Sequence, residues 1–143
     1  MARLRGGIGA LVLDAEGLFK LASGVSRAVS FAMDAHELGA PVVVAASTLA
    51  EVIRGGSRDA LVHRVLKRIE ISPIDAETAR EAGELLGQAG LSGHRCALDA
   101  LVAAVAMAQP RPVVLLTSDS KDMQRLTDEP GRPRRERITV VHV

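Results

Sequence analysis

Short hydrophobic runs alternate along the chain with segments whose apolar residues follow helical spacing. Most of the runs are rich in Val, Ile and Leu, which is typical of strands buried on both faces of a parallel sheet. The pattern predicts five strands, and Pro73 favours an edge position for the third of them. Their expected ranges are residues 9–13, 41–45, 69–74, 113–117 and 138–143.

Four helices are predicted between the strands from apolar residues three or four positions apart. Gly39 and Gly90 are placed to end the first and the third helix, and the fourth is apolar nearly all round, so we expect it at the centre of the fold. This alternation indicates a single α/β domain over residues 1–143, with helices on both faces of a mainly parallel sheet of about five strands. The helical stripes lie in residues 25–33, 61–69, 79–89 and 97–107.

Composition narrows the classes of function. The 143 residues include 18 Lys and Arg against 17 Asp and Glu, a net charge of +1, so nucleic-acid contact must come from a local patch. The chain has no Trp or Tyr and only two Phe, which nearly excludes base stacking on an aromatic platform. Cys96 is the one cysteine, which excludes an intramolecular disulfide and a cysteine-based zinc site. No apolar stretch is long enough for a signal or spanning segment, so we expect a cytoplasmic protein.

Acidic residues follow three of the predicted strands. Asp14 comes directly after the first, Glu51 lies shortly after the second, and Asp119 and Asp122 follow the fourth. Ligands of open parallel sheets bind outside the carboxyl ends of the strands, so we expect these side chains to share one site. The residues that follow the same strands also include the hydroxyl side chains of Ser47, Thr48, Thr117 and Ser118.

Asp99 is the most unusual acid, because it lies inside the most apolar helix, in the segment CALDALVAAVAM. Asp is almost never fully buried unless it is paired. If this helix begins near the same sheet edge, four or five carboxylates converge without matching Lys or Arg. Each pair at about 4 Å costs roughly 4 kcal/mol at an effective dielectric near 20. A divalent cation removes that cost, and Mg²⁺ and Mn²⁺ prefer oxygen ligands. Such an ion can assist in-line attack of water on a phosphodiester.

Most of these acids have a structural alternative when each is considered alone. Asp14 and Asp119 could be helix N-caps. Thr48 and Glu51 match a capping box, with Glu51 as the third helical residue. Asp99 has no routine structural role, and capping does not require all the acids to meet at one edge. The set as a whole therefore favours a metal site.

Four segments together resemble the PIN domain, and most closely the VapC-type toxins of bacterial toxin–antitoxin pairs. The resemblance covers essentially the whole chain, and the acids come in the family's order. The segments are LVLDA, LAEVIRG, LDALVAAVAM and LLTSDSKDMQRL, of which the last is the most specific. The chain departs from the family's usual pattern after Asp14, where Glu16 adds an acid, and in SGHRC before Asp99.

The resemblance implies a three-layer α/β/α sandwich and a Mg²⁺- or Mn²⁺-dependent endoribonuclease that hydrolyses RNA. It implies a homodimer, for which we expect residues 25–33 and 58–68 to form the interface, and a cognate antitoxin protein that inhibits the enzyme. Thr117 or Ser118 would orient the site. The residues that match the family's catalytic and metal-binding acids are Asp14, Glu51, Asp99 and Asp119, with Asp122 as a frequent fifth metal ligand.

Other residues carry weaker indications. Arg54 could contact a substrate phosphate or, alternatively, lie at a helix end where a cation is favourable. The arginine-rich segment at residues 132–137 could bind an RNA backbone, although a solvated loop is the favoured interpretation. Cys96 is expected to be a small core residue.

Two other functions stay open. The chain could be a non-catalytic PIN-like module that binds nucleic acid or protein. It could also be a doubly wound phosphoryl-transfer enzyme. A dehalogenase-type phosphatase would require Asp-x-Asp after the first strand, where the chain has Asp14-Ala15-Glu16, and a receiver domain would use Asp75 after the third. Neither of these enzymes accounts for Asp99.

Overall fold

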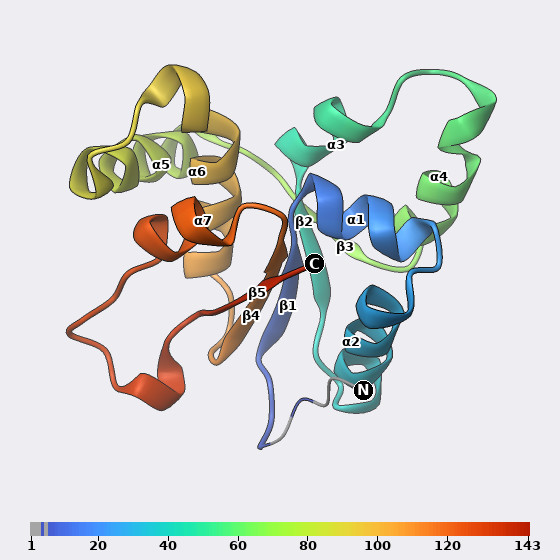
Figure 1. Cartoon of the computed structure of the whole chain (residues 1–143), viewed down its shortest axis with the longest axis horizontal. Coiled ribbons are helices and arrows are strands. Elements are labelled where there is room, and N and C mark those ends of the chain that lie inside the picture. Colours follow the sequence, from blue (N-terminus) through green and yellow to red (C-terminus); the bar gives the residue numbers. More distant parts are fainter. Residues whose placement is uncertain (1–3, 5) are drawn as a thin grey trace.

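The computed structural model describes residues 4 and 6–143, which form a three-layer α/β/α sandwich around one sheet (Figure 1). The sheet has five strands in the order β3-β2-β1-β4-β5, and every neighbouring pair is parallel. The predicted fold class is therefore confirmed. The strands are β1 Ala10–Leu13, β2 Val42–Ala45, β3 Glu70–Ser72, β4 Val113–Thr117 and β5 Thr139–His142.

Seven α-helices cover the two faces of the sheet within the described residues. Helices α1 to α4 lie on one side and α5 to α7 on the other (Figure 1). Two short 3₁₀ turns, Ser57–Asp59 and Arg134–Glu136, lie in the connections. The helices are α1 Ala15–Ala22, α2 Ser26–Glu37, α3 Ala46–Val52, α4 Ala60–Leu66, α5 Ala76–Ala89, α6 Gly93–Met107 and α7 Ser120–Leu126.

The core consists of two apolar layers, one on each face of the sheet. Successive side chains of a strand point to opposite faces, so Leu11 and Leu13 pack under α1 and α2 while Val12 packs under α6. Helix α6 contributes alanines at most of its buried positions, and small side chains allow it to lie close to the strands. It is the central helix that its composition predicts.

Several boundaries differ from those that the pattern predicts. Only residues 70–72 of the expected third strand pair with β2, and this strand is at the sheet edge as Pro73 indicated. Helix α4 ends at Leu66 rather than at Ile69. Helices α1, α3 and α7 have eight residues or fewer, so they carry no extended apolar repeat, and capping patterns alone indicated them. Gly90 ends α5 in the left-handed conformation, as expected.

No helix in the part of the chain that the structure describes has the length and apolarity needed to cross a membrane.

Gly9 directly precedes β1 and lies very close to the backbone of Pro110 and Pro112. Its amide donates to the Pro112 carbonyl at 2.6 Å, and a Cβ at this position would lie 2.0 Å from the Pro110 carbonyl oxygen. We expect Gly9→Ala to lower the free energy of unfolding by about 1–3 kcal/mol in urea titrations, because backbone atoms must move apart. The matched control is Gly83→Ala inside α5, where a Cβ meets nothing within 4 Å. The control should raise stability by about 0.5–1 kcal/mol, and equal effects of the two changes would contradict this account.

Candidate metal centre

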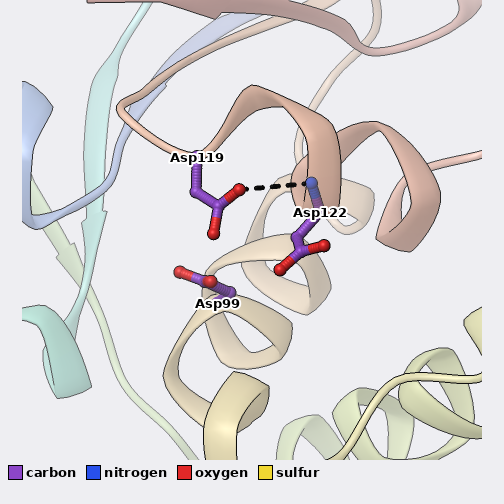
Figure 2. Close-up of side chains that lie close together, drawn as sticks. All are labelled: Asp99, Asp119 and Asp122. Atoms are coloured by element: carbon purple, nitrogen blue, oxygen red, sulfur yellow. Dashed lines mark hydrogen bonds between the residues drawn. The ribbon is translucent and has the colours of Figure 1, made fainter.

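Three aspartates meet at the carboxyl edge of the sheet. Asp99 comes from α6, Asp119 from the turn after β4, and Asp122 from the first turn of α7. One carboxylate oxygen from each lies within 4.8 Å of those of the other two. Figure 2 shows that the three side chains point into the same space from their two helices. This arrangement arises because α6 begins near the edge where β4 ends.

Asp14 belongs to the same edge, since β1 and β4 are neighbours in the sheet. Its side chain is buried, with 6% of the residue exposed. One carboxylate oxygen accepts a hydrogen bond from Gly17 N at 2.7 Å, and the other accepts from Ser118 N at 3.2 Å. The predicted N-cap role at α1 is thus confirmed, and Asp14 also joins β1 to the segment that follows β4.

Glu51 lies in the last turn of α3, with its side chain partly buried. Desolvation raises the pKa of its carboxyl group, the negative charge of Asp14 raises it further, and Arg54 lowers it. The capping-box interpretation of this segment is wrong. Helix α3 follows β2 directly with Ala45 as its N-cap, so Thr48, rather than Glu51, is the third helical residue.

Asp99 has the most perturbed carboxyl group. Desolvation is the largest cause, and the charges of the four other acids add to it, so that the pKa of Asp99 rises from 3.8 to about 6. No hydrogen bond to its carboxylate occurs within the described residues. The acids whose charges act on it are, in order of effect, Asp119, Asp14, Glu51 and Asp122. We refer to these five residues as the acid cluster.

Asp119 is held by its own backbone turn. Its carboxylate accepts from Asp122 N at 3.3 Å, which confirms the predicted N-cap of α7 (Figure 2). The Thr117 hydroxyl oxygen accepts from Asp119 N at 2.9 Å, so this buried side chain fixes the turn that carries Asp119. Ser118 is exposed and contributes its backbone N–H to Asp14.

Arg54 does not pair with the carboxylate of Glu51. Its guanidinium donates to the carbonyls of Ala50, Glu51 and Ile53 at 2.7–2.9 Å, which caps the carboxyl end of α3. This geometry agrees with the alternative role of Arg54 as a cation at the end of a helix. Its expected contact with a substrate phosphate stays a prediction.

Cys96 lies closer to the acids than its sequence context indicated. Its thiol is 3.8 Å from an oxygen of Asp122, and burial and the neighbouring charges of Asp122 and Asp99 raise the pKa of the thiol. The thiol is therefore a neutral donor beside the cluster. Its position one helical turn before Asp99 is the signal from which this proximity could have been predicted.

The arginine-rich segment is partly tied to the protein. Arg132 forms an ion pair with Glu129, and Arg137 donates to the carbonyls of Arg132 and Pro130. Arg134 and Arg135 are exposed in the 3₁₀ turn between them. The segment is thus largely exposed to solvent, as the sequence favoured, while Arg132 and Arg137 are hydrogen-bonded within it.

The acid cluster fits a divalent cation. Across residues 4 and 6–143, no Lys or Arg forms an ion pair with any of its five members. Clustered carboxylates without a counter-ion repel one another, and the raised pKa values of Asp99 and Glu51 reflect that repulsion together with burial. Carboxylate oxygens are the ligands that Mg²⁺ and Mn²⁺ prefer.

Comparisons with known proteins agree with this architecture. A VapBC2 complex from Rickettsia felis, bound to a DNA fragment from its promoter, contains a chain with 18% identity and a TM-score of 0.67, with 94% of this chain and 98% of that chain covered. A toxin–antitoxin complex from Klebsiella pneumoniae gives 24% identity and a TM-score of 0.59, over 92% and 96% of the two chains. A structure of FitAB bound to a DNA fragment gives 19% identity and a TM-score of 0.60, with 92% of this chain and 94% of that chain covered.

At such identities these structures show a shared fold and no more. A search of curated proteins finds no significant match. The sequence profile of the PIN domain, in contrast, matches residues 12–129 and so spans the edge that carries all five acids. The chain therefore belongs to the PIN domain family.

Proposed function

We propose that this protein is a divalent-metal-dependent endoribonuclease, and that residues 1–143 act as one catalytic domain. The observation that carries the proposal is the acid cluster itself. Five carboxylates from four segments converge at the ligand-binding edge of a parallel sheet, and no Lys or Arg among the described residues is paired with them. Membership in the PIN domain family, whose members are generally nucleases, supports the same activity.

Asp14, Asp99 and Asp119 are the proposed ligands of Mg²⁺ or Mn²⁺, with Glu51 and Asp122 bound directly or through water. When bound, the cation supplies Lewis-acid activation of water and charge stabilisation at a phosphodiester. The backbone bonds to Asp14 and Asp119 fix those two carboxylates before any ligand arrives. Water as the attacking group needs no ribose 2′-hydroxyl, so we expect products with a 5′-phosphate and a 3′-hydroxyl.

We further propose that the enzyme is the toxin of a toxin–antitoxin pair in the cytoplasm. The similar solved structures are a VapBC2 complex, a toxin–antitoxin complex and FitAB, which supports a protein antitoxin as partner. A small neighbouring reading frame for a DNA-binding antitoxin would support the proposal, and co-purification of its product would test it. The non-catalytic module is the second candidate function, although decay of the site would not be expected to leave all the acids in place.

The proposed homodimer has a suitable surface on the α2 and α4 side of the molecule. A groove of about 980 Å³ there is lined by Val29, Met33, Val65 and Ile69. Met33, which lines the groove, is 58% exposed. Exposed apolar surface is typical of interaction sites. Val29, Met33 and Val65 fall within the ranges that the sequence predicted for the interface, whereas Ile69 lies just outside them.

Asp99→Asn tests the nuclease directly. The change keeps the shape, removes one ligand charge and breaks no hydrogen bond to the protein, so RNA cleavage with Mg²⁺ or Mn²⁺ should fall by about 100-fold or more. The free energy of unfolding in EDTA should stay equal or rise, because repulsion is relieved. Asp75→Asn is the control, since Asp75 caps α5 through Thr78 and lies outside the acid cluster. Wild-type cleavage by Asp99→Asn would refute the site.

Asp14→Asn should behave differently from Asp99→Asn. Its activity should fall as far, but the new amide nitrogen would face the N–H of Ser118 or Gly17, which now donate to the carboxylate. We therefore expect a loss of about 1–3 kcal/mol in unfolding free energy as well. Equal stability of the two variants in urea titrations would contradict the dual role of Asp14.

The raised pKa of Asp99 predicts a pH dependence of stability in EDTA. Between 3.8 and about 6 the folded protein retains a proton that the unfolded chain has lost. The contribution of Asp99 to stability is therefore fully present below pH 3.8 and is lost as the pH rises through 6. In urea titrations across this range, the free energy of unfolding of the wild type relative to that of Asp99→Asn should decrease as the pH rises. A difference that is flat with pH would oppose the assignment.

The dimer surface is tested by Met33→Glu. Because this side chain is largely exposed, its replacement should leave the fold intact and place a charge in the proposed interface. Light scattering at micromolar concentration should give a dimer for the wild type and a monomer for the variant. Leu98→Glu, an equally drastic change of an exposed leucine on α6, serves as the control. A monomeric wild type would refute the interface.

A further inference from the structure

Two buried hydroxyl groups at the start of α3 have no partner. Among the residues that the structure describes, the buried side-chain nitrogen or oxygen atoms without a hydrogen bond are Ser47 Oγ and Thr48 Oγ1. Thr48 is 0% exposed. By comparison, the buried hydroxyl of Thr127 donates to the Met123 carbonyl at 2.7 Å. An unpaired buried hydroxyl is costly and uncommon, so the pair at Ser47 and Thr48 points to a nearby acceptor on the chain that can turn toward them.

The position of these hydroxyls relates them to Glu51. Ser47 and Thr48 precede it by four and three residues, so they flank it on the helix at roughly 40° and 60° to either side. Helical side chains lean toward the N-terminus, which brings the stem of Glu51 over the turn that carries both hydroxyls. The adjacent face of α3, with Leu49, Val52 and Ile53, packs against the apolar core instead.

The electrostatic setting determines how the hydroxyls act. In the part of the chain that the structure describes, the acid cluster has no paired Lys or Arg, so its negative field favours hydroxyl hydrogens that point toward it. Within the described residues, the Glu51 carboxylate accepts no hydrogen bond that would fix its position, in contrast to Asp14 and Asp119. Two donors without acceptors therefore lie four and three residues before an acceptor without donors, on the same helix.

We propose that Ser47 and Thr48 are positioning residues for Glu51. Their hydroxyls donate to the Glu51 carboxylate when it turns back over this part of α3, and these hydrogen bonds hold the carboxylate in place for the cation. The proposal rests on the proposed function, because it assigns a role in the same cation site. It adds two hydroxyl residues to a site that was defined so far by its carboxylates.

The experiment measures Mn²⁺ affinity of the whole protein by titration calorimetry, together with the urea midpoint in EDTA. Thr48→Val and Ser47→Ala each remove one hydroxyl with little change of shape, and each should weaken Mn²⁺ binding by about 10-fold, as loss of an outer-shell partner does. The urea midpoint should stay equal or rise, because an unpaired buried hydroxyl is lost. Thr48→Ser keeps the hydroxyl and should restore the affinity.

Thr127→Val is the matched control, since it removes a buried hydroxyl that is already paired. It should lower the urea midpoint and leave Mn²⁺ affinity unchanged. Wild-type affinity in both Thr48→Val and Ser47→Ala would overturn the inference while leaving the metal site standing. Absence of Mn²⁺ binding by the wild type would overturn the proposed function and the inference together. If Thr48→Val does not fold, Ser47→Ala decides the outcome.

Discussion

The two hydrogen bonds accepted by Asp14 hold the functional edge of this protein together. Through Gly17 N the carboxylate starts α1, and through Ser118 N it fastens the segment after β4 to the end of β1. The same approach constrains Gly17, where a Cβ would lie 3.0 Å from the Leu116 carbonyl oxygen. The residue proposed to bind the cation therefore also joins the end of β1 to the segment that carries Asp119.

The members of the acid cluster differ in how far backbone N–H groups compensate their negative charge. Asp14 and Asp119 are caps whose negative charge is met by N–H groups at helix starts, where it is favourable. Asp99 and Glu51 have no such partners among residues 4 and 6–143, and the pKa values of their carboxyl groups are raised. The energetic cost of the site is thus concentrated on two side chains, whose carboxyl groups the backbone leaves uncompensated.

The sequence predicted the parts of this structure that depend on local pattern. Buried strands, the apolar helix α6 and the order of the acids follow from hydrophobic runs and from the rule that parallel strands end at one edge. It could not predict the bond from Ser118 to Asp14, which joins residues 104 positions apart. It misplaced the start of α3 because Thr48 and Glu51 imitate a capping box, while the helix in fact begins directly from β2. For Cys96, the sequence indicated only a position one helical turn before Asp99, because its contact with Asp122 depends on how α6 and α7 pack.

The hydrogen bonds of Arg54 affect how the acid cluster can be neutralised when no cation is bound. Its guanidinium is committed to three carbonyls at the end of α3, close enough to Glu51 to act on its charge but not in contact with the carboxylate. An arginine side chain that could turn toward the acids would compete with the proposed cation for the carboxylates, and its effective concentration would be high because it belongs to the same chain. Because the guanidinium is hydrogen-bonded to the backbone, it does not neutralise the acids in place of the proposed cation.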